Sequence, residues 1–473
     1  MDLFPPDFPQ KPKRETDETT KMPPTRSRPQ NQRGPSNGAD EQKPYAPLTV
    51  NHARLERLRL KKRRRRIRMA VVVSVALACV LVYFTGLYGT SIALLGDLTD
   101  SVVIALTPGG GFPLEMNMEE LTDVQPLAGG FAALDGRELT MWSASGKELR
   151  RVQHGYSEPC ITTGNTRVCI YDRGSNALRV EGRRSTLSDK TNTLKGNAIL
   201  AEMSPNGTLA VFTDKGLEVY DPMFNLIWYW NRTDALPLAM AFDSGNRKFA
   251  AALVESRGGA LSSTVYLFET GKSEAIAEIQ ADDAMPVAMK YLSSGSLLCV
   301  FDTRAVIYDT ATGQQTASYE YGTRVLQSVS TGSGLNTVLL FSDVDTSRHA
   351  EVIVLDETLS EAGRAELNTR SLRVASDRTG AYVMTDDSVV SFALDGTLCG
   401  ETLLDETPQR IVCAGKLYLF AGDTAFEFTP PGKPAEGASP AVTDLREDSS
   451  EEQAQSGDAS SSTADASASA AAQ

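Results

Sequence analysis

Short apolar runs alternate with polar turns along residues 112–429. The runs are rich in β-branched and aromatic residues, which favour strands. The segment 199–230 shows the pattern best, and its first turn, Ser204-Pro205-Asn206-Gly207, is typical of a tight hairpin because Asn-Gly readily takes positive φ. Four antiparallel strands in about 40 residues form the unit of a β-propeller blade. The strands predicted in this segment are Ile199–Met203, Thr208–Thr213, Leu217–Tyr220 and Leu226–Trp230.

The glycine of this first hairpin recurs at an average spacing of about 41 residues, which matches the length of a propeller blade. The spacing predicts an all-β, eight-bladed β-propeller, with seven blades as the alternative if the weak unit at 160–190 is irregular. A pair of β-sandwiches would need domain breaks about every hundred residues, and a β-helix has a shorter repeat. The recurring glycines are Gly130, Gly164, Gly207, Gly245, Gly295, Gly334, Gly380 and Gly415.

The last repeat is one strand short. Its predicted strands are Arg410–Cys413, Leu417–Ala421 and Thr424–Thr429, after which the apolar pattern stops. The first repeat has an additional apolar segment ahead of it, Phe112–Met118. Because an open ring would expose strand edges, we expect this segment to supply the missing outer strand and to close the propeller, which then spans residues 112–429.

A segment of 28 residues, 69–96, contains no charged residue. About 20 apolar residues suffice to cross a bilayer, so the segment predicts a single N-terminal transmembrane helix that acts as a signal anchor. It is too long for the apolar region of a cleaved signal peptide. Basic flanks stay on the cytoplasmic side, which predicts a cell-membrane protein with a cytoplasmic N-terminus and an extracellular propeller. The flanking basic residues are Arg63, Arg64, Arg65, Arg66 and Arg68.

The charge of the chain is unevenly distributed. The whole chain carries 47 Lys and Arg against 60 Asp and Glu, whereas residues 1–68 alone carry 18 against 8. A basic arm suits either nucleic acid or an anionic membrane surface, and the apolar segment that follows it favours the membrane. The composition further predicts a disordered basic cytoplasmic tail at 1–68, a linker at 97–111 and a disordered acidic tail at 430–473.

The sequence contains no recognisable catalytic motif. It lacks a Gly-x-Ser-x-Gly elbow, a P-loop, a dinucleotide fingerprint and a His-Glu-x-x-His metal motif. We therefore expect no enzymatic activity, no catalytic residue, no cofactor and no bound metal. His154 is interpreted as a structural, hydrogen-bonded histidine. The acidic turns at 343–345 and 386–387 lack the spaced oxygen ligands of a calcium loop.

The best candidate for a contact patch is an aromatic run on a predicted strand, followed by an arginine. Side chains alternate along a strand, so two of its three rings should face one side. Ordinary packing between blades is nevertheless favoured as the role of these rings. Cys160 and Cys169 would fall on one hairpin, and two free buried thiols are favoured over a disulfide. The patch consists of Trp228, Tyr229, Trp230 and Arg232.

Several local motifs resemble those of a family of uncharacterised, membrane-anchored propeller proteins of Gram-positive bacteria, known only as a domain of unknown function. They are Gly109–Pro113, His154–Ser157 with Pro159, Tyr171-Asp172 with Leu178–Val180, and Ser204–Gly207. The resemblance covers about residues 60–430. It implies the topology and a propeller of the PQQ-like or WD40-like type, but no activity. Quinone-dependent propeller dehydrogenases are similar only in fold, because their adjacent cysteine pair is absent here.

These observations together lead to a functional hypothesis. A large ring without catalytic motifs, tethered to a membrane, predicts a protein-interaction scaffold of the cell envelope with the membrane and an envelope protein as its partners. The alternative is a sensor whose ring binds a small ligand or glycan and reports to the cytoplasmic tail. A hydrolase or dehydrogenase is the third hypothesis, which acidic side chains clustered with a histidine at the central mouth of the ring would support.

Overall fold

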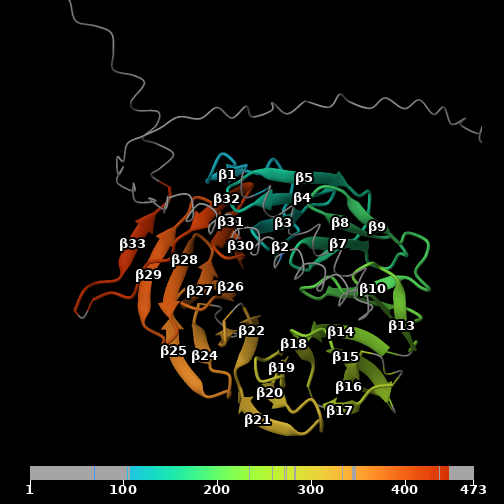
Figure 1. Cartoon of the computed structure of the whole chain (residues 1–473). Helices are drawn as coiled ribbons and strands as arrows, with labels where there is room; N and C mark the ends of the chain where they lie inside the picture. Colours follow the sequence, from blue (N-terminus) through green and yellow to red (C-terminus); the bar gives the residue numbers. More distant parts are fainter. Residues whose placement is uncertain are drawn as a thin grey trace, which may run out of the picture. The chain divides into compact units, whose positions relative to one another are not determined.

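The computed structural model of the chain describes residues 107–446, except for 234, 258, 271, 273, 282–283, 333, 343–347 and 436, and also describes residues 69 and 104. In this part of the chain, eight β-sheets surround a central axis (Figure 1). The predicted eight-bladed β-propeller is therefore confirmed. The seven-bladed alternative is wrong, because the weak unit at 160–190 forms a complete four-stranded blade.

The membrane-related predictions concern residues that are almost all outside this part. The basic tail with Arg63, Arg64, Arg65, Arg66 and Arg68, residues 70–96 of the expected helix, and residues 447–473 lie outside the described residues. Within the described residues, no helix has both the length and the apolar character needed to cross a bilayer.

Blades 1 to 4 each consist of four consecutive strands. Blade 1 comprises β2 (Asp123–Leu127), β3 (Gly130–Leu134), β4 (Glu138–Ser143) and β5 (Glu148–Gln153). Blade 2 comprises β6 (Pro159–Thr163), β7 (Arg167–Asp172), β8 (Leu178–Gly182) and β9 (Thr186–Asp189). Blade 3 comprises β10 (Ala198–Met203), β11 (Leu209–Thr213), β12 (Gly216–Tyr220) and β13 (Leu226–Asn231). Blade 4 comprises β14 (Ala235–Phe242), β15 (Lys248–Arg257), β16 (Ala260–Glu269) and β17 (Ala277–Ala281).

Blades 5 to 8 follow the same plan with two additions, β1 and β33. Blade 5 comprises β18 (Pro286–Tyr291), β19 (Leu297–Phe301), β20 (Arg304–Tyr308) and β21 (Gln315–Glu320). Blade 6 comprises β22 (Val325–Ser330), β23 (Thr337–Ser342), β24 (Ala350–Leu355) and β25 (Glu361–Leu367). Blade 7 comprises β26 (Ser371–Ser376), β27 (Gly380–Thr385), β28 (Ser388–Ala393), β29 (Leu398–Leu403) and β33 (Ala441–Asp444). Blade 8 comprises β30 (Pro408–Cys413), β31 (Leu417–Ala421), β32 (Thr424–Phe428) and β1 (Leu114–Glu115).

The burial of the strands explains why the sequence pattern is readable. The second strand of a blade lies between neighbouring strands and neighbouring blades, so that β11, β19 and β31 are buried at every residue. Such strands are continuous apolar runs. The outer strands, such as β21, alternate between exposed and half-buried residues. The core therefore consists of apolar clusters between adjacent blades, such as the one that joins Phe212 of blade 3 to Phe249 and Phe268 of blade 4.

The ring is closed by a strand from its N-terminal side, as the sequence predicted. β1 pairs antiparallel with β32, where Leu114 lies opposite Ala425 and Glu115 opposite Thr424. The strand is shorter than the predicted segment Phe112–Met118, but the amide of Met118 also donates to the Asp423 carboxylate at 2.9 Å. Blade 8 thus combines both ends of the propeller sequence, and this closure removes an open edge.

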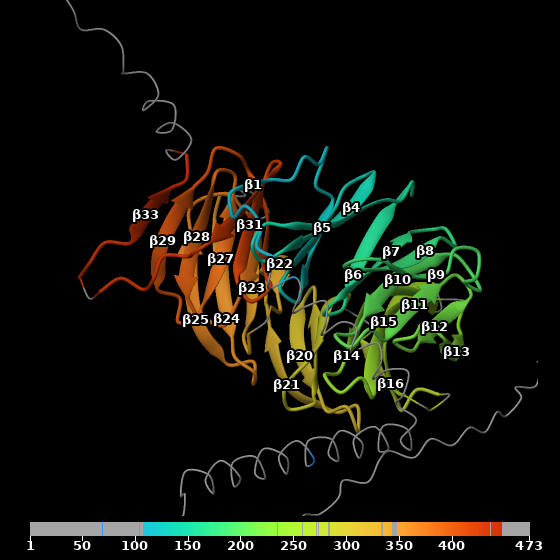
Figure 2. The same ribbon diagram turned by 45° about the horizontal axis from the view of Figure 1, so that its top comes forward.

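Both segments that flank the propeller contact it. Gly109, in the expected linker 97–111, donates its amide to the Ser145 hydroxyl at 2.8 Å. The region 430–473, expected to be a flexible tail, contains β33, which pairs with the outer edge of β29 (Figures 1 and 2). Because β33 pairs through its backbone, its sequence does not need alternating apolar residues. The sequence pattern therefore did not predict this strand.

Candidate functional site

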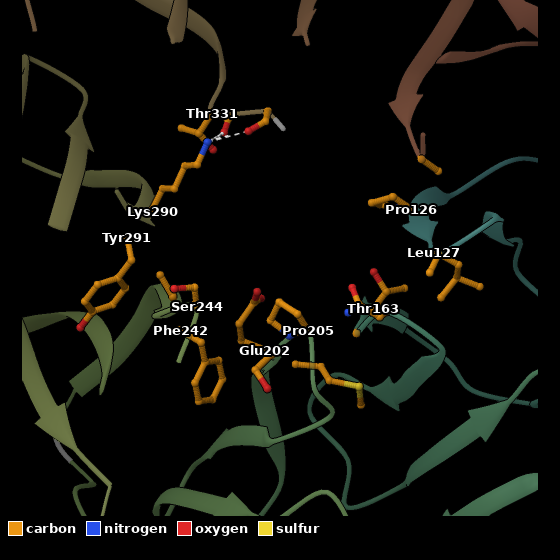
Figure 3. Close-up of a pocket in the computed structure, with 18 of the residues that line it drawn as sticks. Pro126, Leu127, Thr163, Glu202, Pro205, Phe242, Ser244, Lys290, Tyr291 and Thr331 are labelled. Atoms are coloured by element: carbon orange, nitrogen blue, oxygen red, sulfur yellow. Dashed lines mark hydrogen bonds between the residues drawn. The ribbon is translucent and has the colours of Figure 1, made fainter. Parts of the chain in front are cut away.

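The central channel contains a cavity of about 790 Å³ at one face of the ring. We call this the hairpin face, because it carries the turns between the first and second strands of the blades. Seven blades contribute to the cavity wall, and blade 7 does not. Figure 3 shows Glu202 of blade 3 and Lys290 of blade 5 at different places on this wall. Two of the eight predicted hairpin glycines, Gly164 and Gly415, line this cavity directly.

Glu202 is the acidic side chain of the cavity with the most altered titration. It lies near the end of β10, a strand that is otherwise made of small and apolar residues. Burial against its neighbours raises the pKa of the Glu202 carboxyl to about 8, and the Thr162 side chain partly offsets this effect. The carboxyl is thus largely protonated at neutral pH and can donate a hydrogen bond into the cavity.

Lys290 joins blades 5 and 6 at the cavity wall. Its ammonium group donates to the carbonyl oxygens of Thr331 at 2.5 Å, Gly332 at 2.6 Å and Gly334 at 3.0 Å (Figure 3). Burial lowers the pKa of Lys290. Because an ammonium group has three N–H donors, these three carbonyls use all of them. Lys290 therefore holds the turn after β22 in place and has no donor left for an anionic ligand.

The opposite face, on which the innermost strands begin, presents apolar side chains. They lie in the first half of β14, on either side of the first residue of β18 and at the first residue of β22, in three consecutive blades. We call this set the apolar rim. Exposed apolar groups that are gathered in this way are typical of interaction surfaces. The rim and the exposed fractions of its residues are Leu236 (61 %), Leu238 (37 %), Met285 (37 %), Val287 (49 %) and Val325 (47 %).

The aromatic run that the sequence singled out lies on β13, the outer strand of blade 3. Trp228 and Trp230 face blade 4: Trp228 lies 5.0 Å from Phe268, and Trp230 lies 4.9 Å from Tyr266, between ring centroids. Tyr229 faces the other way, and its hydroxyl donates to the Lys215 carbonyl at 2.7 Å. The predicted alternation of the three rings is confirmed, and the two tryptophans pack between blades.

Arg232, the fourth member of that patch, is held by blade 4. Its guanidinium pairs with the carboxylate of Glu255 and donates to the Tyr266 hydroxyl at 2.8 Å. The Tyr266 hydroxyl in turn donates to Glu255 at 3.0 Å, and burial raises the pKa of Tyr266 to about 12. Trp228, Trp230 and Arg232 therefore serve the interface between blades 3 and 4, and Tyr229 is the member turned away from it.

His154 has the structural surroundings that were expected. Its Nδ1 accepts a hydrogen bond from the Tyr156 amide at 3.0 Å, and its Nε2 lies 3.2 Å from the carbonyl oxygen of Asp135. This arrangement fits the neutral ring with the proton on Nε2, and burial lowers the pKa of His154. His154 does not line the cavity on the hairpin face. Among the described residues, no histidine lines that cavity, so the cluster of acidic side chains with a histidine is not found there.

The remaining sequence candidates are distributed over the ring. Cys160 and Cys169 are free thiols, and Cys169 lies opposite Thr162 rather than opposite Cys160. Residues 386–387 form the turn between β27 and β28, whereas 343–347 lie outside the described residues. Over the described part of the chain, no group of three or more His, Cys, Asp or Glu residues is placed to hold a metal ion.

Sequence reasoning missed Glu202, Lys290 and the apolar rim. The only signal for Glu202 and Lys290 is a single charged residue in the first strand of a repeat, where most neighbours are apolar. The rim could have been found from apolar residues at strand starts, but such residues usually join the core.

Comparison with known proteins gives a family and a fold. The model of a family described as a family of unknown function (DUF5711) matches residues 114–427. No curated protein matches the chain. Similar solved structures include BamB from Moraxella catarrhalis, with 14 % identity over 68 % of this chain and 99 % of that chain and a TM-score of 0.47. Sqt1 from Saccharomyces cerevisiae has 11 % identity over 67 % and 97 %, with a TM-score of 0.51. The C-terminal WD40 domain of Sif2 has 9 % identity over 67 % and 99 %, with a TM-score of 0.48. Such identities concern the fold alone.

Proposed function

We propose, starting from the fact that this chain belongs to the family of unknown function DUF5711, that it is a membrane-anchored, extracytoplasmic scaffold protein. In this proposal its β-propeller binds a protein partner of the cell envelope at one mouth of the central channel. A propeller is a rigid ring with broad faces, but its fold alone does not specify a function. The proposal therefore rests on a particular surface.

The observation that carries the proposal is the apolar rim. Leu236 and Val287 are 61 % and 49 % exposed at the channel mouth opposite the hairpin face. Most apolar side chains of this propeller are buried between neighbouring blades. The rim is an exception, because blades 4, 5 and 6 all leave apolar side chains exposed at the same mouth of the channel. A protein partner with apolar side chains of its own would remove this surface from water.

The anchor is supported by the sequence, and the structure shows where the segment after it contacts the ring. The uncharged segment 69–96 and the arginines before it have the length and charge of a spanning helix with a cytoplasmic flank. The Gly111 amide donates to the Ser145 carbonyl at 3.0 Å, in the turn between β4 and β5. That turn lies on the hairpin face, because the Ala144 amide donates to the Gly129 carbonyl at 2.7 Å. Gly111 thus contacts the ring on the hairpin face, opposite the rim.

The interaction is tested by capture with the full chain in detergent or nanodiscs. We expect the wild-type chain to recover a stoichiometric envelope protein, and Leu236→Glu to lose it. Leu335→Glu is the matched control, because Leu335 is also 61 % exposed but lies in the turn between β22 and β23, outside the rim. The proposal is wrong if both variants recover the same partner as the wild type, or if the wild type recovers none.

Membrane topology has its own test. Protease added to intact cells should digest the propeller and leave the N-terminal arginine-rich segment protected. Digestion of only the arginine-rich end would indicate the opposite membrane topology. Complete protection of the chain from added protease would contradict an extracellular propeller.

A second candidate function rests on the cavity of the hairpin face. A space of about 790 Å³ with the protonated carboxyl of Glu202 at its wall is large enough for a small polar ligand such as an oligosaccharide. In this alternative the chain is a sensor whose ring binds a ligand or glycan. A ligand that binds only the folded chain raises its melting temperature. A thermal-shift screen of the full chain, repeated with Glu202→Ala, separates this alternative from the scaffold function.

A further inference from the structure

Blade 7 differs from the other blades at its outer edge. Among the described strands, β29 is the only fourth strand of a blade that carries a fifth strand. β33 runs parallel to β29, with Gly400 opposite Ala441, Glu401 opposite Val442, Thr402 opposite Thr443 and Leu403 opposite Asp444. All other pairs of neighbouring strands in the described ring are antiparallel, so β33 is an addition to a blade that is already complete. Figures 1 and 2 show β33 at the periphery of the ring.

The edge of β29 is shaped for this addition. A Cβ atom at Gly400 would lie 2.3 Å from the carbonyl oxygen of Ala441 and 2.9 Å from the side chain of Pro431. The three atoms nearest to this Cβ all belong to Ala441 and Pro431, and none belongs to strands β26 to β29. The absence of a side chain at Gly400 therefore serves the close approach of the added segment and not the packing of the blade itself.

The added strand is held mainly by its backbone and at its two ends. Ala441, Val442 and Thr443 are exposed, with Val442 at 67 %. Before the strand, Lys433 pairs with Asp395, but both side chains are more than half exposed, so that this pair contributes little. After the strand, the Leu445 amide donates to the Leu403 carbonyl at 3.2 Å.

The Leu445 side chain provides the apolar end of this attachment. It packs against the cluster between blades 7 and 8 and lines a recess of about 160 Å³ together with Leu404, Ala421 and Phe426. The exposed Arg446 adds a charge attraction to Asp387 and Asp405. A four-residue backbone ladder, one half-buried leucine and an exposed charge are a weak attachment. Another strand with the same geometry could therefore replace it.

We propose that the outer edge of β29 is a strand-acceptor site, which residues 441–446 occupy within the chain and which a protein partner binds by inserting an extended strand of its own. Recognition is by strand addition, in which backbone hydrogen bonds supply affinity and a pocket for one side chain supplies specificity. The partner segment runs parallel to β29 and has a large apolar residue directly after its paired residues, at the place of Leu445. This site is independent of the apolar rim and of the proposed scaffold function.

The test uses the full chain with its own strand disabled. The double variant Val442→Pro/Thr443→Pro removes two consecutive amides, and in a parallel pair one of any two consecutive residues turns its amide to the neighbouring strand. A fluorescent synthetic peptide with the sequence of residues 437–446 is then titrated against this variant, and its polarisation is measured. The melting temperature of the variant confirms that the ring remains folded.

We expect the peptide to bind the double variant at least about tenfold more tightly than it binds the wild-type chain, whose site is filled. Two controls address the mechanism. The same peptide with prolines at the positions of 442 and 443 should bind at least about tenfold more weakly. Adding Gly400→Val to the double variant should abolish binding, because the new side chain occupies the place of the incoming backbone. The proposal is wrong if the folded double variant does not bind the peptide, or if the proline peptide or the Gly400→Val chain binds equally well.

Discussion

The ring of Phe131 meets the ring of Phe420 edge-on, with 4.9 Å between their centroids. Phe131 belongs to the first blade and Phe420 to the last, so this contact joins the two ends of the propeller sequence. Both side chains are completely buried. Tyr418 extends the contact, at 5.2 Å from Phe131 and 5.3 Å from Phe112.

Loss of this contact should destabilise the whole ring. We expect Phe420→Ala to lower the free energy of unfolding by about 3–5 kcal/mol, because it removes a buried ring and leaves a cavity at the closure. Urea denaturation followed by tryptophan fluorescence measures the effect, since Trp142 belongs to the same cluster. Ile227→Ala on the exposed edge of β13 serves as the control, with a change below about 1 kcal/mol. Equal effects of the two variants would show that the closure is not a critical contact.

The sequence predicted the closure because its two parts are both visible in the apolar pattern. The last repeat lacked one strand, and within residues 112–429 Phe112–Met118 was an apolar segment without a repeat of its own. The hairpin glycines were equally informative, because each marks a turn at which strands reverse. These features are local in sequence, and a repeating fold converts local features into a global architecture.

The cavity and the strand-acceptor edge could not be predicted in the same way. Glu202 and Thr162 come from different blades, and the three carbonyls that surround Lys290 belong to backbone outside its own blade. β33 pairs through its backbone, so residues 441–444 have no apolar periodicity that would distinguish them from the acidic tail. Contacts between repeats depend on how the blades stack, which a single repeat does not encode.

Lys290 should act as a structural link between blades 5 and 6. We expect Lys290→Met to lower the free energy of unfolding by about 2–3 kcal/mol, because three carbonyls lose their donor while the side chain keeps its length. Hydrogen exchange should rise in the turn after β22. The exposed ion pair of Lys416 with Glu427 provides the control, and Lys416→Met should cost less than about 1 kcal/mol. An unchanged exchange rate at 331–334 would contradict the role assigned to Lys290.

Glu202 should make the stability of the protein depend on pH in an unusual direction. Its pKa of about 8 in the folded chain lies above the ordinary value of 4.5, so the folded state holds the proton more tightly than the unfolded state does. Its contribution to stability is therefore complete below about pH 4.5 and is lost as pH rises through about 8. We expect the wild type to lose about 1–3 kcal/mol between pH 6 and 9 relative to Glu202→Gln. Parallel pH profiles for Glu202→Gln and Glu120→Gln, an exposed control, would contradict this prediction.

The two sides of β13 should respond differently to truncation. Trp230 packs against Tyr266 and Phe268 of blade 4, with centroid distances of 4.9 and 5.1 Å. We expect Trp230→Ala to lower the free energy of unfolding by about 2–4 kcal/mol, since the ring is half-buried. Tyr229 faces the opposite side, where Lys195 lies 3.4 Å from its ring centroid, and Tyr229→Ala should cost less than about 1 kcal/mol. Both substitutions are at adjacent residues of β13, so the two variants differ mainly in the side of the strand from which a ring is removed. A larger loss of stability for Tyr229→Ala than for Trp230→Ala would show that the aromatic run does not act mainly through the interface between blades 3 and 4.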